Sequence, residues 1–157
     1  MNVCRLQDGI GKRRHLREVR HKDIKMQRGL INMSNWKVYN PNPRKKRVGD
    51  CTVRALCKAL DQSWETIYAA LTAYGFMDCD MPSANNVWGK YLKKMGFSRY
   101  FVDDNGKDVY TVEDFCKDHP SGTHILALDG HVVCVENGYY YDSWDSGYEE
   151  PIYYWKK

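Results

Sequence analysis

The spacing of apolar residues predicts helices in the first part of the folded region and strands in the second. Just after residue 50, apolar side chains recur at i, i+3, i+4 and i+7, which is the spacing of a helix face that packs against a core. These residues are Val53, Leu56, Cys57 and Leu60. Asp50 precedes them in the position of a good helix N-cap. The pattern therefore predicts a helix from residue 51 to about residue 60.

Three more helices are predicted from signals at their ends. One spans residues 63–74 and ends at Gly75, and the next spans residues 83–95, with Ser83 as its N-cap. A Thr-Val-Glu-Asp segment matches a capping box, in which two side chains and two backbone N–H groups pair at a helix start. It predicts a short helix within residues 111–118.

Beyond Gly122 the sequence becomes rich in Ile, Val, Tyr and Trp, which are the residues that strands favour. Four strands are predicted there, and a short one before them, at 123–129, 131–136, 139–143, 151–155 and 97–102. Asn137-Gly138 is a strong signal for a two-residue hairpin turn. Helices followed by an antiparallel sheet predict an α+β domain.

Charge divides the 157-residue chain into two parts. The formal net charge is +4, but residues 1–32 alone hold nine Lys and Arg against three acids. From Val48 to the end, ten Lys and Arg face seventeen acids, a net charge of −7. Because residues 1–32 have few large apolar groups, we interpret them as a basic, mobile extension. Residues 33–157 form the predicted folded domain, and a basic pI is therefore poor evidence that this domain binds nucleic acid.

Several classes of protein are excluded by what the sequence lacks. No apolar run is long enough for a membrane span, so we expect no membrane partner. No secretory signal is recognisable, and we expect a cytoplasmic protein in which the six cysteines stay reduced. No Cys and His residues have the spacing of zinc ligands, so no metal and no cofactor are predicted.

Cys51 would be the first residue of the first predicted helix. At that position the unpaired N–H groups and the helix dipole favour an anion, which lowers the pKa of a thiol and makes a nucleophilic thiolate available. The adjacent Asp50 carries a negative charge that acts in the opposite direction. A basic partner is therefore required, and histidine is the obvious candidate.

The predicted hairpin supplies that partner. If Asn137-Gly138 forms a two-residue turn, Val133 faces Asp142 across the hairpin. His131 lies on the same strand face as Val133, so His131 and Asp142 are diagonal neighbours within reach of each other. The carboxylate would orient the imidazole, which completes a set of nucleophile, base and orienting group. Asp145 is the rival orienting group, and the same register places Trp144 opposite His131.

The sequence resembles a known family in several short runs. These are Asn40-Pro-Asn-Pro, Gly49-Asp-Cys-Thr-Val-Arg-Ala-Leu, Ser63-Trp, Pro120-Ser-Gly-Thr, Gly130-His and Tyr141-Asp. The family is that of small papain-like cysteine peptidases found in bacteriophages and mobile elements. The resemblance covers about residues 36 to 157, and the order of Cys, then His, then Asp or Asn is that of the papain superfamily.

The resemblance implies a papain-like fold and a role for each residue. Cys51 would be the nucleophile, His131 the base and then acid, and Asp142 the orienting group. Lys45 stands where papain-like enzymes carry the glutamine of the oxyanion hole. Asn40 is the candidate for the second oxyanion donor, with Asn42 as the alternative.

We therefore expect a cysteine peptidase or a related thiol-dependent amide hydrolase. Its substrate would be a peptide or protein, such as a host protein if the gene belongs to a phage. Two alternatives remain open. One is a nucleic-acid-binding protein that uses the basic arm and residues 44–47, although a solvated loop is the more ordinary explanation of that basic run. The other is a catalytically silent host-interaction protein on the same fold.

Overall fold

Six strands form one mixed sheet in the computed structural model, which describes residues 34–103 and 106–157. The spatial order is β1-β5-β4-β3-β6-β2. The strands are β1 (Trp36–Val38), β2 (Ser98–Phe101), β3 (Thr123–Leu128), β4 (His131–Glu136), β5 (Tyr139–Asp142) and β6 (Tyr153–Lys156). The predicted extension at residues 1–32 lies outside the described residues.

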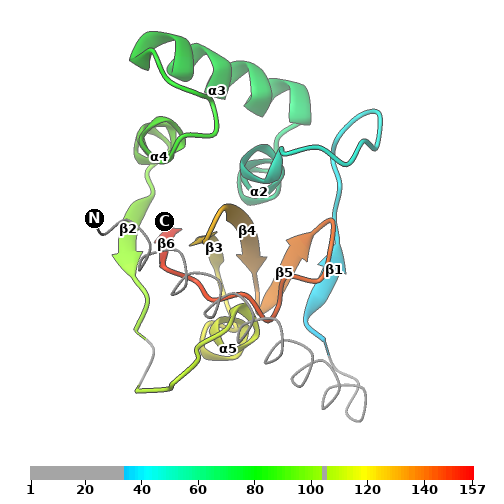
Figure 1. The fold of residues 1–157 in the computed structure, drawn as a ribbon, viewed down its shortest axis with the longest axis vertical. Coiled ribbons are helices and arrows are strands. Elements are labelled where there is room, and N and C mark those ends of the chain that lie inside the picture. The colour runs from blue at the N-terminus through cyan, green and yellow to red at the C-terminus, as the bar shows by residue number, and fades with distance from the viewer. Residues whose placement is uncertain (1–33, 104–105) are drawn as a thin grey trace, which may run out of the picture. The chain divides into compact units, whose positions relative to one another are not determined.

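Helices cover both faces of this sheet (Figure 1). The helices are α2 (Cys51–Leu60), α3 (Trp64–Asp78), α4 (Asn85–Lys94) and α5 (Val112–Asp118). On one face, Leu56 of α2 packs with Ile125 and Cys134 of the central strands, together with residues of α3 and α4. On the other face, Phe115 of α5 packs against Leu126 and the neighbouring strands. Alternate residues of β3 and β4 enter opposite cores, so the predicted α+β class is confirmed.

The hairpin between β4 and β5 has the register that the sequence predicts. Glu136 pairs with Tyr139, and Cys134 pairs with Tyr141, on either side of the Asn137-Gly138 turn. Both turn residues have positive φ angles, 52° and 78°, which a two-residue hairpin turn of type I′ requires. The strand ends that carry His131 and Asp142 are thereby brought side by side.

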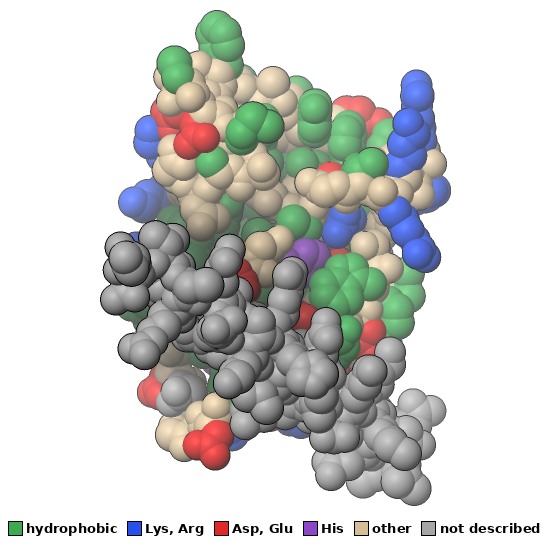
Figure 2. Space-filling model, viewed as in Figure 1, with side chains coloured by type: hydrophobic (Ala, Val, Ile, Leu, Met, Phe, Trp, Pro, Cys, Tyr) green, Lys and Arg blue, Asp and Glu red, His purple; other side chains and the backbone are tan. Residues whose placement is uncertain are grey.

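The sequence predicts an antiparallel sheet, and this prediction is wrong for one pair of strands, which is parallel. The extra strand is β1, which pairs in parallel with β5 at the edge of the sheet. It has three residues, two of them exposed, and this is too short for an alternating pattern to be recognised. The β1 strand matters because it starts the loop of residues 39–50 that leads into α2. Lys and Arg side chains gather over that loop, at the upper right in Figure 2.

Two helix boundaries differ from their predictions. Ser63 caps α3 as expected, with its hydroxyl accepting the N–H of Thr66, but the helix continues past Gly75 to Asp78. Ser83 lies in a turn, and Ala84 is the N-cap of α4. The predicted capping box of Thr111 and Asp114 is confirmed at the start of α5.

Gly75 explains why the end signal of α3 was wrong. A Cβ atom at this position would lie 2.7 Å from the carbonyl oxygen of Asp80. The chain folds back so closely after the helix that the amide N–H of Asp80 donates to the carbonyl of Gly75, at 2.9 Å. The glycine is therefore required for close backbone approach inside a helix, and it does not end the helix.

We expect Gly75→Ala to lower the free energy of unfolding by about 1–3 kcal/mol, the usual cost of overpacking. Alanine is the better helix former, so the substitution would stabilise the protein if space were available. Urea unfolding followed by circular dichroism measures the change. Gly49→Ala is the matched control, because a Cβ there meets nothing within 4 Å. An unfolding free energy at or above the wild-type value for Gly75→Ala would contradict this explanation.

Candidate active site

Cys51 is the first residue of α2 and is partly exposed. Asp50 occupies the N-cap position, but its side chain makes no capping hydrogen bond, contrary to the expectation from the sequence. Its carboxylate instead pairs with Arg54 and accepts the indole N–H of Trp64 at 2.9 Å. The first N–H groups of the helix, which have no intrahelical acceptors, are therefore not capped by Asp50.

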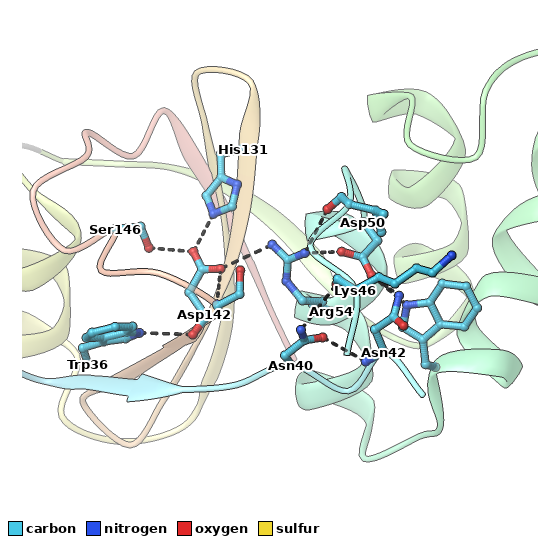
Figure 3. Close-up of polar contacts among 12 residues, drawn as sticks. Trp36, Asn40, Asn42, Lys46, Asp50, Arg54, His131, Asp142 and Ser146 are labelled. Atoms are coloured by element: carbon cyan, nitrogen blue, oxygen red, sulfur yellow. Dashed lines mark hydrogen bonds and ion pairs between the residues drawn. The ribbon is translucent and has the colours of Figure 1, made fainter. Parts of the chain in front are cut away.

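His131 begins β4 and Asp142 ends β5, and their side chains are in direct contact. The distance from His131 Nε2 to Asp142 Oδ2 is 2.5 Å (Figure 3). Asp142 also accepts the hydroxyl of Ser146 at 2.8 Å and the backbone N–H of Ser143 at 2.7 Å. The carboxylate is buried and held in one orientation by these donors. The diagonal relation predicted from the hairpin register is therefore present.

His131 lowers the pKa of the Cys51 thiol, both as a side-chain hydrogen-bond partner and through its charge. Because Nε2 of the ring is bonded to Asp142, the nitrogen that remains for the thiol is Nδ1. Burial, the largest single influence, would raise the pKa of Cys51. The hydrogen bond and charge of His131, the backbone N–H of Val132 and the charge of Arg54 together outweigh burial and lower this pKa. The arrangement favours a thiolate.

His131 shows the complementary change. Burial by itself would lower the pKa of this imidazole, but the hydrogen bond and charge of Asp142 and the contact with Cys51 raise it to about 9. A pKa above neutrality means that the ring holds its second proton at pH 7. The pair is therefore best described as a thiolate next to an imidazolium, which is an activated nucleophile with its proton donor in place.

Arg54 connects the two carboxylates that flank this pair. Its Nη1 pairs with Asp50 Oδ1, and its Nη2 lies 3.4 Å from Asp142 Oδ1 (Figure 3). The arginine side chain is only 7% exposed. It lies one helical turn after Cys51, on the buried side of α2. Our sequence interpretation gave Arg54 no role, although the i, i+4 spacing from Asp50 is a recognisable ion-pair signal.

The two neighbours predicted for the site have different outcomes. Trp144 lies against His131, with ring centroids 5.1 Å apart, so it borders the site as expected. Asp145 accepts the hydroxyl of Tyr140 at 2.5 Å and the N–H of Gly147 at 3.2 Å. The carboxylate that contacts His131 is therefore that of Asp142, whereas the carboxylate of Asp145 binds Tyr140 and Gly147.

Asn40, the candidate second oxyanion donor, is engaged within its own loop. Its side-chain N–H donates to the carbonyl of Lys46 at 3.4 Å, and its Oδ1 accepts the N–H of Asn42 at 3.0 Å. The amide of Asn42 in turn donates to Asp50 at 3.3 Å. Both asparagines thus shape the loop that leads into α2, and the side-chain amide of each already donates to an acceptor, the carbonyl of Lys46 for Asn40 and the carboxylate of Asp50 for Asn42.

The other buried titratable groups have a different character from Cys51 and His131. Burial raises the pKa of the thiols of Cys57, Cys116 and Cys134. His124 packs edge-on against Phe115, and burial lowers its pKa to about 4, so it is a neutral core residue. Its role in packing agrees with the position of its strand between the two helical layers.

Within residues 34–103 and 106–157, no three His, Cys, Asp or Glu side chains are grouped so that they could hold a metal ion. In the same part of the chain, no helix is long and apolar enough to cross a membrane. Comparisons of the chain with protein-family models, with curated proteins and with solved structures found no match. The function of this chain is therefore inferred from the geometry of the site.

We expect Arg54→Met to lower the free energy of unfolding by about 3–5 kcal/mol, because it removes the cation that pairs with the buried Asp50 carboxylate and one of the two cations beside Asp142. Lys58→Met is the matched control. It breaks the ion pair between Lys58 and Glu136, whose side chains are 22% and 28% exposed, respectively. This should lower the free energy of unfolding by about 1 kcal/mol or less. Urea unfolding of both variants measures the difference, and equal losses would contradict the proposed importance of Arg54.

The protonation of His131 should depend on Asp142. In wild type the imidazole should titrate near pH 9, because the carboxylate stabilises the charged ring. In Asp142→Asn the pKa should fall toward the ordinary value of about 6.5, since the amide has no charge. NMR titration of the ring C–H signals measures this pKa. Asp145→Asn is the control and should leave it unchanged; an equal fall in both variants would contradict the assignment.

Proposed function

We propose that the protein is a thiol-dependent amide hydrolase, most simply a cysteine peptidase, built on a papain-like fold. The observation that carries the proposal is the 2.5 Å contact between the His131 ring nitrogen and the Asp142 carboxylate, together with the interaction of His131 with Cys51 that lowers the pKa of the thiol. Two further features support it. The thiol starts a helix, while His131 begins β4 and Asp142 ends the adjacent β5, and the chain order is Cys, then His, then Asp.

The proposed reaction begins from the thiolate and imidazolium. Cys51 Sγ attacks the substrate carbonyl carbon, and a carbon–sulfur bond forms. As the carbon–nitrogen bond breaks, His131 donates its proton to the departing amine. Water then enters, His131 accepts one of its protons, and the hydroxyl oxygen bonds to the acyl carbon. The carbon–sulfur bond breaks, which releases a carboxylic acid and restores the thiolate.

The negative oxygen of each tetrahedral intermediate needs hydrogen-bond donors. We assign this role to the N–H groups at the start of α2, including that of Cys51, because they have no intrahelical acceptors and Asp50 does not cap them. This assignment replaces Asn40, whose amide would first have to break its hydrogen bond with the carbonyl of Lys46.

The alternative nucleic-acid function depends mainly on residues 1–32, which lie outside the described residues. None of the site geometry favours it. The catalytically silent alternative shares the fold with our proposal and differs only in whether the thiol reacts.

Covalent labelling distinguishes these functions. Iodoacetamide or an acyl electrophile at neutral pH should modify wild-type protein first at Cys51, as mapped by mass spectrometry of its peptides. Cys51→Ala should lose this fast modification and keep its fold. Cys79→Ala is the matched control, because Cys79 is an exposed thiol outside the site, and it should be labelled like wild type. Labelling of Cys51 no faster than that of Cys79 would contradict the proposed nucleophile.

A further inference from the structure

A pocket of about 370 Å³ lies beside the two residues that precede Cys51. Gly49 and Asp50 form one side of it. Its remaining lining residues are Asn42, Pro43, Arg44, Lys46, Val48, Trp64 and Tyr68. Since an extended peptide advances by about 3.3 Å per residue, a substrate held at Cys51 would reach this pocket within a few residues of the reacting bond. The pocket is therefore placed to contact a substrate.

The walls of the pocket are largely apolar. The rings of Trp64 and Tyr68 are stacked, with centroids 4.6 Å apart and planes within 11° of each other. Tyr68 and Val48 are 47% and 49% exposed, although side chains of these types are more often buried. The indole of Trp64 is fixed by its hydrogen bond to Asp50. This side of the pocket is thus a pre-formed surface for an apolar side chain.

The rim of the pocket is basic. Arg44 and Lys46 line it, and Arg47 follows in the same loop, where the Lys and Arg side chains gather in Figure 2. Among the residues that the structure describes, none of these three forms a salt bridge with a carboxylate. The one carboxylate lining the pocket is that of Asp50, and its charge is balanced by Arg54. The local charge available to a ligand is therefore positive.

The rim could attract either a nucleic acid or an acidic peptide, and the charge of the surrounding domain distinguishes between these two ligands. The part of the domain that follows the basic loop, from Val48 onward, carries ten Lys and Arg against seventeen acids, and this net charge opposes a long nucleic acid. A short peptide with one or two acids responds mainly to charges within about 8 Å, the screening length at physiological salt. The basic rim with apolar walls thus fits an acidic peptide better than a nucleic acid.

We propose that this pocket is a specificity site for a substrate segment that carries an apolar side chain flanked by acidic residues. This inference rests on the proposed function, because it treats the peptide as the substrate of Cys51. The apolar side chain lies against Trp64 and Tyr68, and the flanking carboxylates pair with Arg44 and Lys46. Apolar contact provides affinity, while the charges select acidic sequences.

The test uses Cys51→Ala, which cannot turn over a substrate, and two fluorescent pools of degenerate octapeptides. Each pool has a fixed central leucine, flanked by glutamate in one pool and by glutamine in the other. Fluorescence anisotropy should show that the glutamate pool binds about tenfold more tightly. Adding Arg44→Glu and Lys46→Glu should abolish this preference. Tyr68→Ala should weaken the binding of both pools.

The matched control adds Lys93→Glu and Lys94→Glu at the end of α4, which makes the same change in net charge away from the pocket. This control should keep the preference for glutamate. Loss of preference in both charge-reversed variants, or no preference in Cys51→Ala, would overturn the proposal. Tighter binding of a fluorescent single-stranded oligonucleotide, in competition with the peptides, would overturn it in favour of nucleic acid.

Iodoacetamide labelling of the wild-type protein separates this inference from the proposed function. Fast labelling of Cys51 in wild type, together with no peptide preference in Cys51→Ala, would contradict only the specificity site. Peptide preference in Cys51→Ala, together with slow labelling of Cys51 in wild type, would contradict the hydrolase and leave a peptide-binding pocket.

Discussion

The buried guanidinium of Arg54 connects the helix that carries Cys51 with the strand that carries Asp142. It contacts Asp50 at the start of α2 and Asp142 at the end of β5, and all three side chains are buried. Each carboxylate would be costly to bury alone, since an unpaired charge loses its hydration without compensation. Arg54 thus fixes the spacing between the two layers at the place where the thiol and the imidazole meet.

The same constraint explains how a domain with an excess of acids can hold a thiolate. The charge of Asp50, next to Cys51 in sequence, is balanced by Arg54, while His131 and the N–H of Val132 lower the pKa of the thiol. Asp142 holds the proton on His131. The negative and positive charges alternate along one chain of contacts, and this favours the ionised pair over the neutral thiol and imidazole.

The site could be predicted where it depends on local rules of chain geometry. The hairpin register follows from the Asn137-Gly138 turn and the two-residue repeat of strands, so the meeting of His131 and Asp142 was predictable. The position of Cys51 followed from helix periodicity, and the α+β class from the order of the elements.

The features that were missed depend on contacts between distant segments. The three residues of β1 are too few to show a strand pattern, so its parallel pairing with β5 could not be predicted. Gly75 has the appearance of a helix end in the sequence, which does not show that the chain folds back against it. Arg54 looks like a polar residue on a helix until the strand that brings Asp142 is in place. The loop bonds that occupy Asn40 are likewise invisible in the sequence.

The central claim is that His131 holds Cys51 as a thiolate, and the pH dependence of alkylation tests it most directly. The rate of iodoacetamide modification of Cys51 should be measured from pH 5 to pH 10 in wild type and in His131→Ala. We predict that wild type reacts fast already below the ordinary thiol pKa of about 8.5, while the variant reacts only at higher pH, because burial of the thiol remains. Coinciding profiles for the two proteins would contradict the account.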